Sequence, residues 1–197
     1  MNISIVIASY NQSQTFERCL VSLLSTVYEH KYEIVIVDSS TDPHREIISS
    51  IVDKYVAVGH INIRFIRLPK QTYCGHARNI GISHANYDYI AMTDTDCEVD
   101  KNWLTVAQKH MRPKIFLNGV IENGTPQNLF GTSLFLFEFS KYIHLKQEMI
   151  FHSKEGFGAQ MIFHKSALNM AGQFEPVYDD TIFTKKVSPA GRLHYST

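Results

Sequence analysis

The sequence has few cysteines and no surplus of charge, and both absences exclude classes of protein. Its three cysteines are odd in number and unevenly spaced, which argues against a disulfide framework and favours a reducing compartment. Nineteen basic and nineteen acidic residues give a formal net charge of +0, so no nucleic-acid partner is expected. We expect a cytoplasmic protein, with the inner face of the membrane as an alternative location.

Long hydrophobic runs are absent as well. The most apolar stretch, residues 129–145, is interrupted by Glu138 and Lys141 and is shorter than a membrane span. The sequence has no P-loop and no Ser–His–Asp order, and its ten histidines show no metal-ligand spacing. An anionic ligand must therefore be bound by local charges or through a metal ion.

What the first hundred residues do contain is an alternation of strand and helix patterns. Strands are predicted over residues 3–8, 33–37, 61–68 and 87–92, with helices that begin at Thr15 and Pro43 and a third helix over residues 75–85. This order is typical of a parallel sheet with right-handed crossovers and of nucleotide-binding domains. We therefore expect an α/β, Rossmann-like fold, in which a mixed, mainly parallel central sheet is flanked by helices.

The remaining residues have a less regular pattern. Helices are predicted over residues 103–111, 128–145, 166–170 and 180–187, and strands over 115–121, 156–163 and 192–196. Aromatic residues also alternate within 128–145, so a strand is an alternative there, although the length favours a helix. A chain of 197 residues is long enough for a single domain with a sizeable core.

The most distinctive segment is residues 89–100, where an apolar run turns abruptly acidic. Four acidic residues stand at alternate positions, beginning with Asp94 and Asp96. In an extended segment, side chains two positions apart point the same way, so these two carboxylates are expected to converge. Two like charges about 4 Å apart repel by roughly 4 kcal/mol at an effective dielectric near 20, which favours a bound cation. Oxygen ligands suit Mg²⁺ or Mn²⁺; the alternative is a solvated acidic turn.

Five segments of the chain resemble family-2 glycosyltransferases. They are IVIASYN at 5–11, IVDSSTD at 36–42, GHARNIG at 75–81, DTD at 94–96, and GQFEP at 172–176 with the acidic pair that follows it. Each segment alone is weakly specific, but this order and spacing over nearly the whole chain is strongly so. The resemblance implies an A-type glycosyltransferase fold, a nucleotide-diphosphate sugar donor and transfer with inversion.

The resemblance also implies roles for residues on the donor side. Asp38 would contact the nucleotide base, and Ser9 and Tyr10 would line the base pocket. Arg78 would reach the base or the diphosphate. Two alternatives stay open. Asp38 could be a helix N-cap that contacts no base, and Arg78 could form a surface ion pair.

A second set of residues carries the metal and the chemistry. Asp94 would lie near the ribose and the metal, and Asp96 would hold an Mg²⁺ or Mn²⁺ ion on the diphosphate. Asp180 would be the general base, with Asp179 beside it where the family usually has Glu. Either of the two can therefore be the base. The implied division is a single domain over residues 1–197, with a nucleotide-binding half, 1–100, and an acceptor and catalytic half, 101–197.

The implied partners are a UDP- or GDP-type sugar and a glycan or lipid-linked acceptor, with peripheral membrane contact as an option. The sequence stops seventeen residues after Asp180, whereas the family usually continues further. We therefore expect either a minimal domain, or a partner or a missing segment that completes the acceptor site. The alternative function is a donor-binding, weakly active or inactive subunit of a glycan-assembly complex. A nucleotidyltransferase is disfavoured, because no glycine-rich, basic segment follows the first strand.

Overall fold

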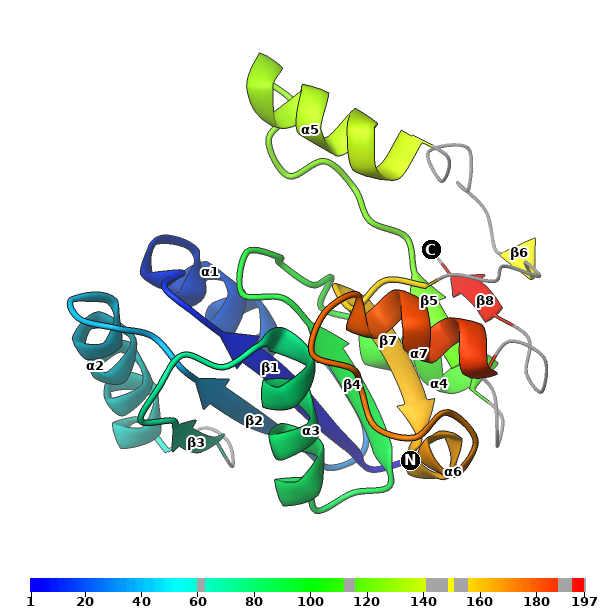
Figure 1. Cartoon of the computed structure of the whole chain (residues 1–197), viewed down its shortest axis with the longest axis horizontal. Coiled ribbons are helices and arrows are strands. Elements are labelled where there is room, and N and C mark those ends of the chain that lie inside the picture. Colours follow the sequence, from blue (N-terminus) through cyan, green and yellow to red (C-terminus); the bar gives the residue numbers. More distant parts are fainter. Residues whose placement is uncertain (60–62, 112–115, 141–148, 151–155, 188–192, 197) are drawn as a thin grey trace.

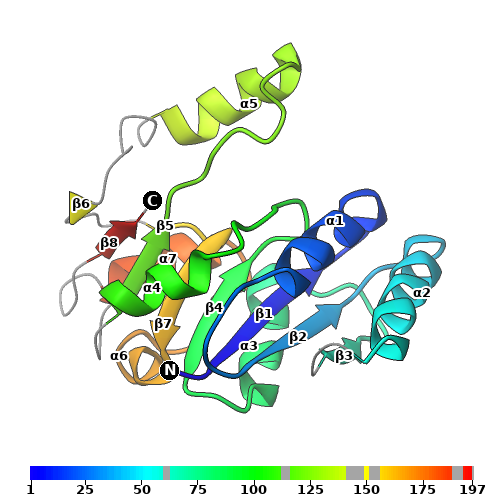
Figure 2. The same ribbon diagram turned by 180° about the vertical axis from the view of Figure 1, so that it is seen from behind.

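The computed structural model describes residues 1–59, 63–111, 116–140, 149–150, 156–187 and 193–196. In this part of the chain, one eight-stranded sheet has the strand order β3-β2-β1-β4-β7-β5-β8-β6. Helices cover both of its faces, with α3 and α7 on one side and α1, α2 and α4 on the other (Figures 1 and 2). The predicted α/β architecture is confirmed.

The first half of the chain forms four parallel strands joined by three helices. The strands are β1 (Ile3–Ser9), β2 (Tyr32–Asp38), β3 (Ile63–Arg67) and β4 (Tyr89–Thr93), and the helices are α1 (Ser13–Leu24), α2 (His44–Ala57) and α3 (Cys74–His84). The apolar side chains of α1 explain its position. Phe16, Cys19, Leu20 and Leu23 recur at helical spacing and are all buried against the sheet.

The second half adds antiparallel pairs, which make the sheet mixed. Its elements are α4 (Trp103–His110), β5 (Phe116–Gly119), β6 (Met149–Ile150), β7 (Gln160–His164), the 3-10 turn η2 (Lys165–Ala167), α6 (Leu168–Ala171), α7 (Asp179–Val187) and β8 (Leu193–Ser196). Strand β7 lies between β4 and β5 and is antiparallel to both. The predicted strand over 115–121 is thus formed by β5, and residue 115 lies outside the described part.

A cluster of four phenylalanines fixes α7 on the sheet. Phe174 and Phe183 stack with ring centroids 4.0 Å apart, and both pack against Phe163 of β7. Phe116 of β5 completes the cluster by stacking on Phe163 at 5.0 Å. Because all four side chains are buried, the start of α7 has a defined position relative to the sheet.

Helix α5 (Leu129–Phe139) confirms the helical alternative for the apolar stretch. It begins after Asn128, whose side chain accepts hydrogen bonds from the backbone N–H groups of Phe130 and Gly131. The helix lies away from the sheet in both views (Figures 1 and 2) and none of its residues is buried. Among the described residues, no helix is both long and apolar enough to cross a membrane. Residues 141–145 of the predicted helix lie outside the described part.

Candidate active site

The carboxyl ends of three neighbouring parallel strands bring the donor-side residues together. Strand β1 ends at Ser9, β2 at Asp38 and β4 at Thr93, and these strands are adjacent in the sheet. Ser9 and Asp38 are directly paired in the parallel register. This edge is where ligands bind in open α/β sheets.

Three buried polar atoms at this edge have no hydrogen-bond partner among the described residues. Asp38 is fully buried; its Oδ1 accepts a hydrogen bond from Ser40 Oγ at 2.6 Å, while its Oδ2 accepts none from the described part of the chain. The buried Ser9 Oγ and Thr93 Oγ1 are likewise without a partner in that part. The alternative in which Asp38 caps a helix is wrong, because Pro43 is the N-cap residue of α2 and no side chain caps that helix. Unpaired buried polar atoms are rare in proteins, so a ligand that supplies partners is an economical explanation.

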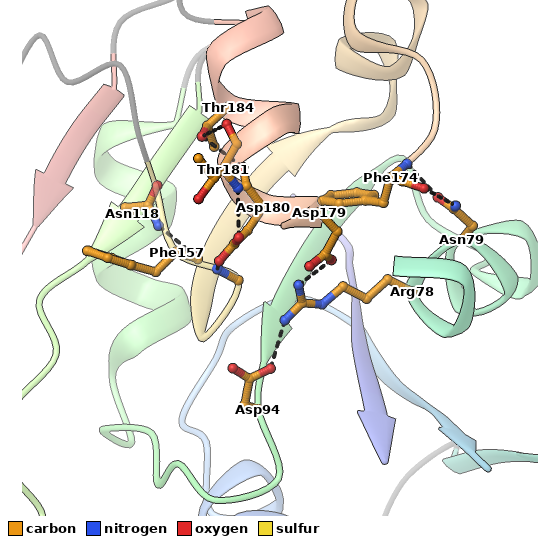
Figure 3. Close-up of polar contacts among 11 residues, drawn as sticks. Arg78, Asn79, Asp94, Asn118, Phe157, Phe174, Asp179, Asp180, Thr181 and Thr184 are labelled. Atoms are coloured by element: carbon orange, nitrogen blue, oxygen red, sulfur yellow. Dashed lines mark hydrogen bonds and ion pairs between the residues drawn. The ribbon is translucent and has the colours of Figure 1, made fainter. Parts of the chain in front are cut away.

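Arg78 of α3 is the centre of the site (Figure 3). Its side chain is 5% exposed, and its Nη2 donates to Asp94 Oδ1 at 2.8 Å while its Nη1 donates to Asp179 Oδ2. The surface ion pair considered from the sequence is therefore wrong; the guanidinium is a buried bridge. Burial lowers the pKa of Arg78, but the charges of Asp94 and Asp179 outweigh it and raise that pKa, so the bridge stays charged.

The acidic segment after β4 forms a turn rather than a continued strand. The backbone N–H of Cys97 donates to the carbonyl of Asp94 at 3.1 Å, which closes the turn, and Asp96 is exposed. Convergence of Asp94 and Asp96 was expected for an extended backbone, and the turn gives the two side chains other relative directions than a strand would. Burial raises the pKa of Asp94, Arg78 lowers it, and the nearby charges of Asp96 and Asp180 raise it further; the net direction is upward.

The two carboxylates that open α7 have different environments (Figure 3). Asp179 is buried and bound to Arg78. Asp180 is half-buried; its Oδ2 accepts from the backbone N–H of Gly158 at 2.8 Å and its Oδ1 from that of Thr181 at 2.7 Å. Both lie in the first turn of a helix, where its dipole favours negative charge.

Residues that the sequence analysis did not single out hold these groups in place. Asn79 donates to the carbonyl of Phe174 at 2.8 Å and accepts from its N–H at 2.9 Å, which ties α3 to the segment before α7. Asn118 of β5 donates to the carbonyl of Phe157, beside Gly158. The position of Asn79 in the GHARNIG segment was an available signal. Nothing in the sequence pattern marks Asn118.

The residues at this site suit a divalent cation. The described residues contain no group of three or more His, Cys, Asp or Glu side chains that could hold a metal. Arg78 nevertheless pairs with two carboxylates, those of Asp94 and Asp179. Burial is the main cause of the raised pKa of Asp94, and the nearby negative charges of Asp96 and Asp180 raise it further. Mg²⁺ typically binds through one or two protein carboxylates and keeps positions for water and substrate phosphates, so Asp94 and Asp96 fit such an ion. The roles assigned to Ser9, Tyr10, Asp38 and the other site residues stay predictions.

Known proteins similar to this chain are glycosyltransferases. The chain is 34% identical over 100 residues to the poly-beta-1,6-N-acetyl-D-glucosamine synthase of Staphylococcus aureus (strain COL). The matched region covers 51% of this chain and 23% of that protein. The same named protein of Staphylococcus epidermidis is 34% identical over 98 residues, 50% of this chain and 22% of that protein. The chain thus spans less than a quarter of the length of these curated relatives.

Solved structures share the fold. A mannosyltransferase of Pyrobaculum calidifontis, in complex with GDP-Man and Mn²⁺, matches 99% of this chain and 54% of its own with a TM-score of 0.73 at 20% identity. TarS 1–349 of S. aureus in complex with UDP-GlcNAc matches 100% of this chain and 58% of its own, with a TM-score of 0.68 at 21% identity. The predicted A-type glycosyltransferase fold is confirmed. Residues 4–168 match the glycosyl transferase family 2 profile, and the chain therefore belongs to that family.

Proposed function

We propose that this chain transfers a sugar from a nucleotide-diphosphate sugar to a hydroxyl acceptor with inversion, assisted by a divalent cation. The observation that carries the proposal is the Arg78 bridge, which joins Asp94 on the donor side to Asp179 at the start of α7. Displacement of a nucleotide diphosphate needs charge stabilisation on one side of the anomeric carbon and a base on the other. Two separate acidic groups on either side of one buried guanidinium suit that division.

The donor site that we propose lies at the carboxyl edge of β1 and β2. Asp38 Oδ2 accepts no hydrogen bond from the described residues, and a uracil or guanine ring N–H would supply one. Ser9 Oγ lies buried on the neighbouring strand, and the half-exposed Tyr10 follows it. Among the structurally similar proteins, TarS is complexed with UDP-GlcNAc and the Pyrobaculum mannosyltransferase with GDP-Man. We therefore propose either uracil or guanine as the donor base of this chain.

We assign Asp96 and Asp94 to the cation, which is Mg²⁺ or Mn²⁺. When bound, the ion supplies charge stabilisation to the departing diphosphate. Asp94 keeps its Oδ1 on Arg78, and its Oδ2 has no hydrogen-bond partner among the described residues. Asp96 is exposed and so accessible to an ion that arrives with its donor.

We assign the proton transfer to Asp180, with Asp179 as the alternative. Asp179 is buried and its charge is paired with Arg78, whereas Asp180 is half-buried and accepts only backbone N–H groups among the described residues. Each oxygen of Asp180 keeps a lone pair for the acceptor proton. As the acceptor oxygen attacks the anomeric carbon, its proton passes to Asp180, and the bond to the diphosphate breaks on the opposite face. This geometry gives inversion.

Binding and turnover measured together test this function. Thermal unfolding is followed with UDP, GDP and their sugars, each with Mn²⁺ and with a chelator, and released nucleotide is then measured with candidate acceptors. We expect stabilisation by one nucleotide that depends on the cation, loss of that dependence in Asp96→Ala, and release of nucleotide diphosphate. Equal affinity with metal and with chelator would remove the metal assignment. Binding without any turnover would favour the donor-binding subunit instead.

We further propose a glycan or lipid-linked acceptor, bound mainly by residues 101–197, and peripheral contact with a membrane. Helix α5 supports this contact, because Leu129, Phe130 and Phe137 are 86%, 74% and 86% exposed. Sedimentation with phospholipid vesicles compares the wild-type chain with Phe130→Ser/Phe137→Ser. Binding of the wild type and its loss in the variant would support membrane contact, whereas equal recovery in the supernatant would remove it.

A further inference from the structure

A short segment between β5 and α7 contacts both the proposed base and the buried guanidinium. We name residues 156–158, with the sequence Gly-Phe-Gly, the glycine strap. One residue separates the strap from β7, and the strap lies beside Asp180 in Figure 3. Its hydrogen bonds run to β5 on one side and to α7 on the other.

On the β5 side, Asn118 holds the strap. Its side chain is fully buried, and its Nδ2 donates to the carbonyl of Phe157 at 2.9 Å and to that of Gln160 at 2.8 Å. Both amide hydrogens are therefore used on backbone groups of the strap and of the first residue of β7. No leucine or valine at this position could make these contacts, so the buried amide has a specific purpose here.

On the α7 side, Thr184 holds the strap. The backbone N–H of Gly156 donates to Thr184 Oγ1 at 3.0 Å, and the hydroxyl in turn donates to the carbonyl of Asp180 at 2.8 Å. Thr184 is 1% exposed. The hydroxyl thus joins the strap to the backbone of the residue that we assign as the base.

The end of the strap meets the site itself. Gly158 donates its backbone N–H to Asp180 Oδ2 at 2.8 Å. A Cβ built at Gly158 would overlap the guanidinium of Arg78, so only glycine allows this approach. The strap therefore touches the carboxylate of Asp180 through a hydrogen bond and the bridge of Arg78 through close packing.

We propose that Asn118 and Thr184 are positioning residues, which act through the glycine strap to orient the Asp180 carboxylate. This inference rests on the proposed function, because it takes Asp180 as the base. The strap fixes one oxygen of Asp180 with the Gly158 N–H, while the other accepts from Thr181. A base held in one orientation keeps its free lone pair aimed at the acceptor, which is where a small misplacement lowers the rate most.

Thr184→Val and Thr184→Ser form the matched pair that tests the inference. Valine keeps the shape of threonine but removes the hydroxyl, whereas serine keeps the hydroxyl and loses only a methyl group. We expect Thr184→Val to lower kcat by about 10- to 100-fold with the nucleotide affinity and donor KM unchanged, and Thr184→Ser to retain most of the wild-type kcat. A residue with only a packing role would give the reverse order or no split between kcat and KM.

A second measurement does not depend on turnover. The chain has ten glycines, so their amide signals are few, and sequential ¹³C/¹⁵N connectivities to Phe157 identify the Gly158 signal without a substitution in the strap. Asp180→Ala shows how that signal moves when its acceptor is removed. We expect Thr184→Val to move it in the same direction and Thr184→Ser to leave it at its wild-type position.

The outcomes separate the inference from the function on which it rests. If Thr184→Val leaves both the Gly158 signal and kcat unchanged, the inference is wrong. The role of Asp180 as the base is then still tested separately, by the kcat of Asp180→Asn. If Asp180→Asn leaves an active wild type unaffected, the proposed base is wrong and the inference falls with it. If Thr184→Val does not fold, Asn118→Ala replaces it, because this substitution removes the support of the strap from the β5 side. The same two measurements, the shift of the Gly158 amide signal and kcat, then test the inference.

Discussion

At the scale of single residues, the buried charge of Arg78 governs the site. A buried guanidinium is tolerated only with partners, and Arg78 has one carboxylate on each terminal nitrogen. Burial disfavours the ionised form of Asp94, and the charge of Arg78 offsets only part of that effect. Stability and ligand binding are therefore coupled at these residues.

Removal of the bridge is expected to destabilise the fold strongly. Arg78→Met keeps much of the volume but leaves Asp94 and Asp179 without their partner. We expect a loss of about 3–5 kcal/mol in the free energy of unfolding, the usual result of breaking a buried ion pair, measured by urea denaturation. Arg18→Met is the matched control, because Arg18 and its partner Glu98 are 59% and 58% exposed. That control should change stability by less than about 1 kcal/mol; equal losses in the two variants would contradict the buried bridge.

The raised pKa of Asp94 makes metal binding depend on pH. A carboxyl group whose pKa is higher in the folded state destabilises the fold when it ionises. That penalty is absent below the ordinary pKa of the group and fully present above the raised one, where a cation on Asp94 relieves it. We expect Mn²⁺ to raise the unfolding temperature near neutral pH and this increase to vanish on acidification, at a higher pH than an ordinary aspartate would give. A metal effect that does not change with pH would count against Asp94 as a ligand.

At the scale of elements, hydrophobic periodicity predicted the helices and strands, because burial of one face is a local property of the sequence. The contacts that make the site are not local. Arg78 and Asp179 lie 101 positions apart, and Asn118 and Phe157 lie 39 apart. The family motifs contain Arg78 and Asp179, but they did not predict the ion pair between them. No feature of the sequence predicted the contact between Asn118 and Phe157. The turn after β4 was only the alternative to an extended segment, since alternate acidic residues fit a strand as well as a turn.

The junction between α3 and the segment before α7 gives an element-scale prediction. Gly75 lies in α3, where alanine would ordinarily favour the helix by about 1 kcal/mol. A Cβ there would overlap the carbonyl oxygen of Glu175 and lie 2.8 Å from Asp179 Cβ. We therefore expect Gly75→Ala to destabilise the fold by about 1–3 kcal/mol in urea denaturation and to lower turnover. Gly124→Ala is the control, because no atom of the described residues lies within 4 Å of its Cβ position; a stabilising Gly75→Ala would refute this packing.

At the scale of the whole molecule, the sheet order brings two distant acidic segments to one place. Strands β1 and β2 carry the donor edge, β4 delivers Asp94, and β7 with the phenylalanine cluster fixes the start of α7 opposite it. The chain has no net charge, yet two carboxylates pair with the guanidinium of Arg78, and the charges of Asp96 and Asp180 act on Asp94. That local excess of negative charge is what a cation and a proton acceptor require.

The most direct test of the account compares turnover in Asp180→Asn and Asp179→Asn with the wild type, while nucleotide and Mn²⁺ affinities are measured in parallel. We predict that Asp180→Asn lowers kcat by about 10²- to 10⁴-fold with both affinities unchanged, because a base takes no part in donor binding. Asp179→Asn should lower kcat less, since asparagine can still accept from Arg78. A larger loss in Asp179→Asn would exchange the two roles. An active wild type that neither substitution slows would contradict the account.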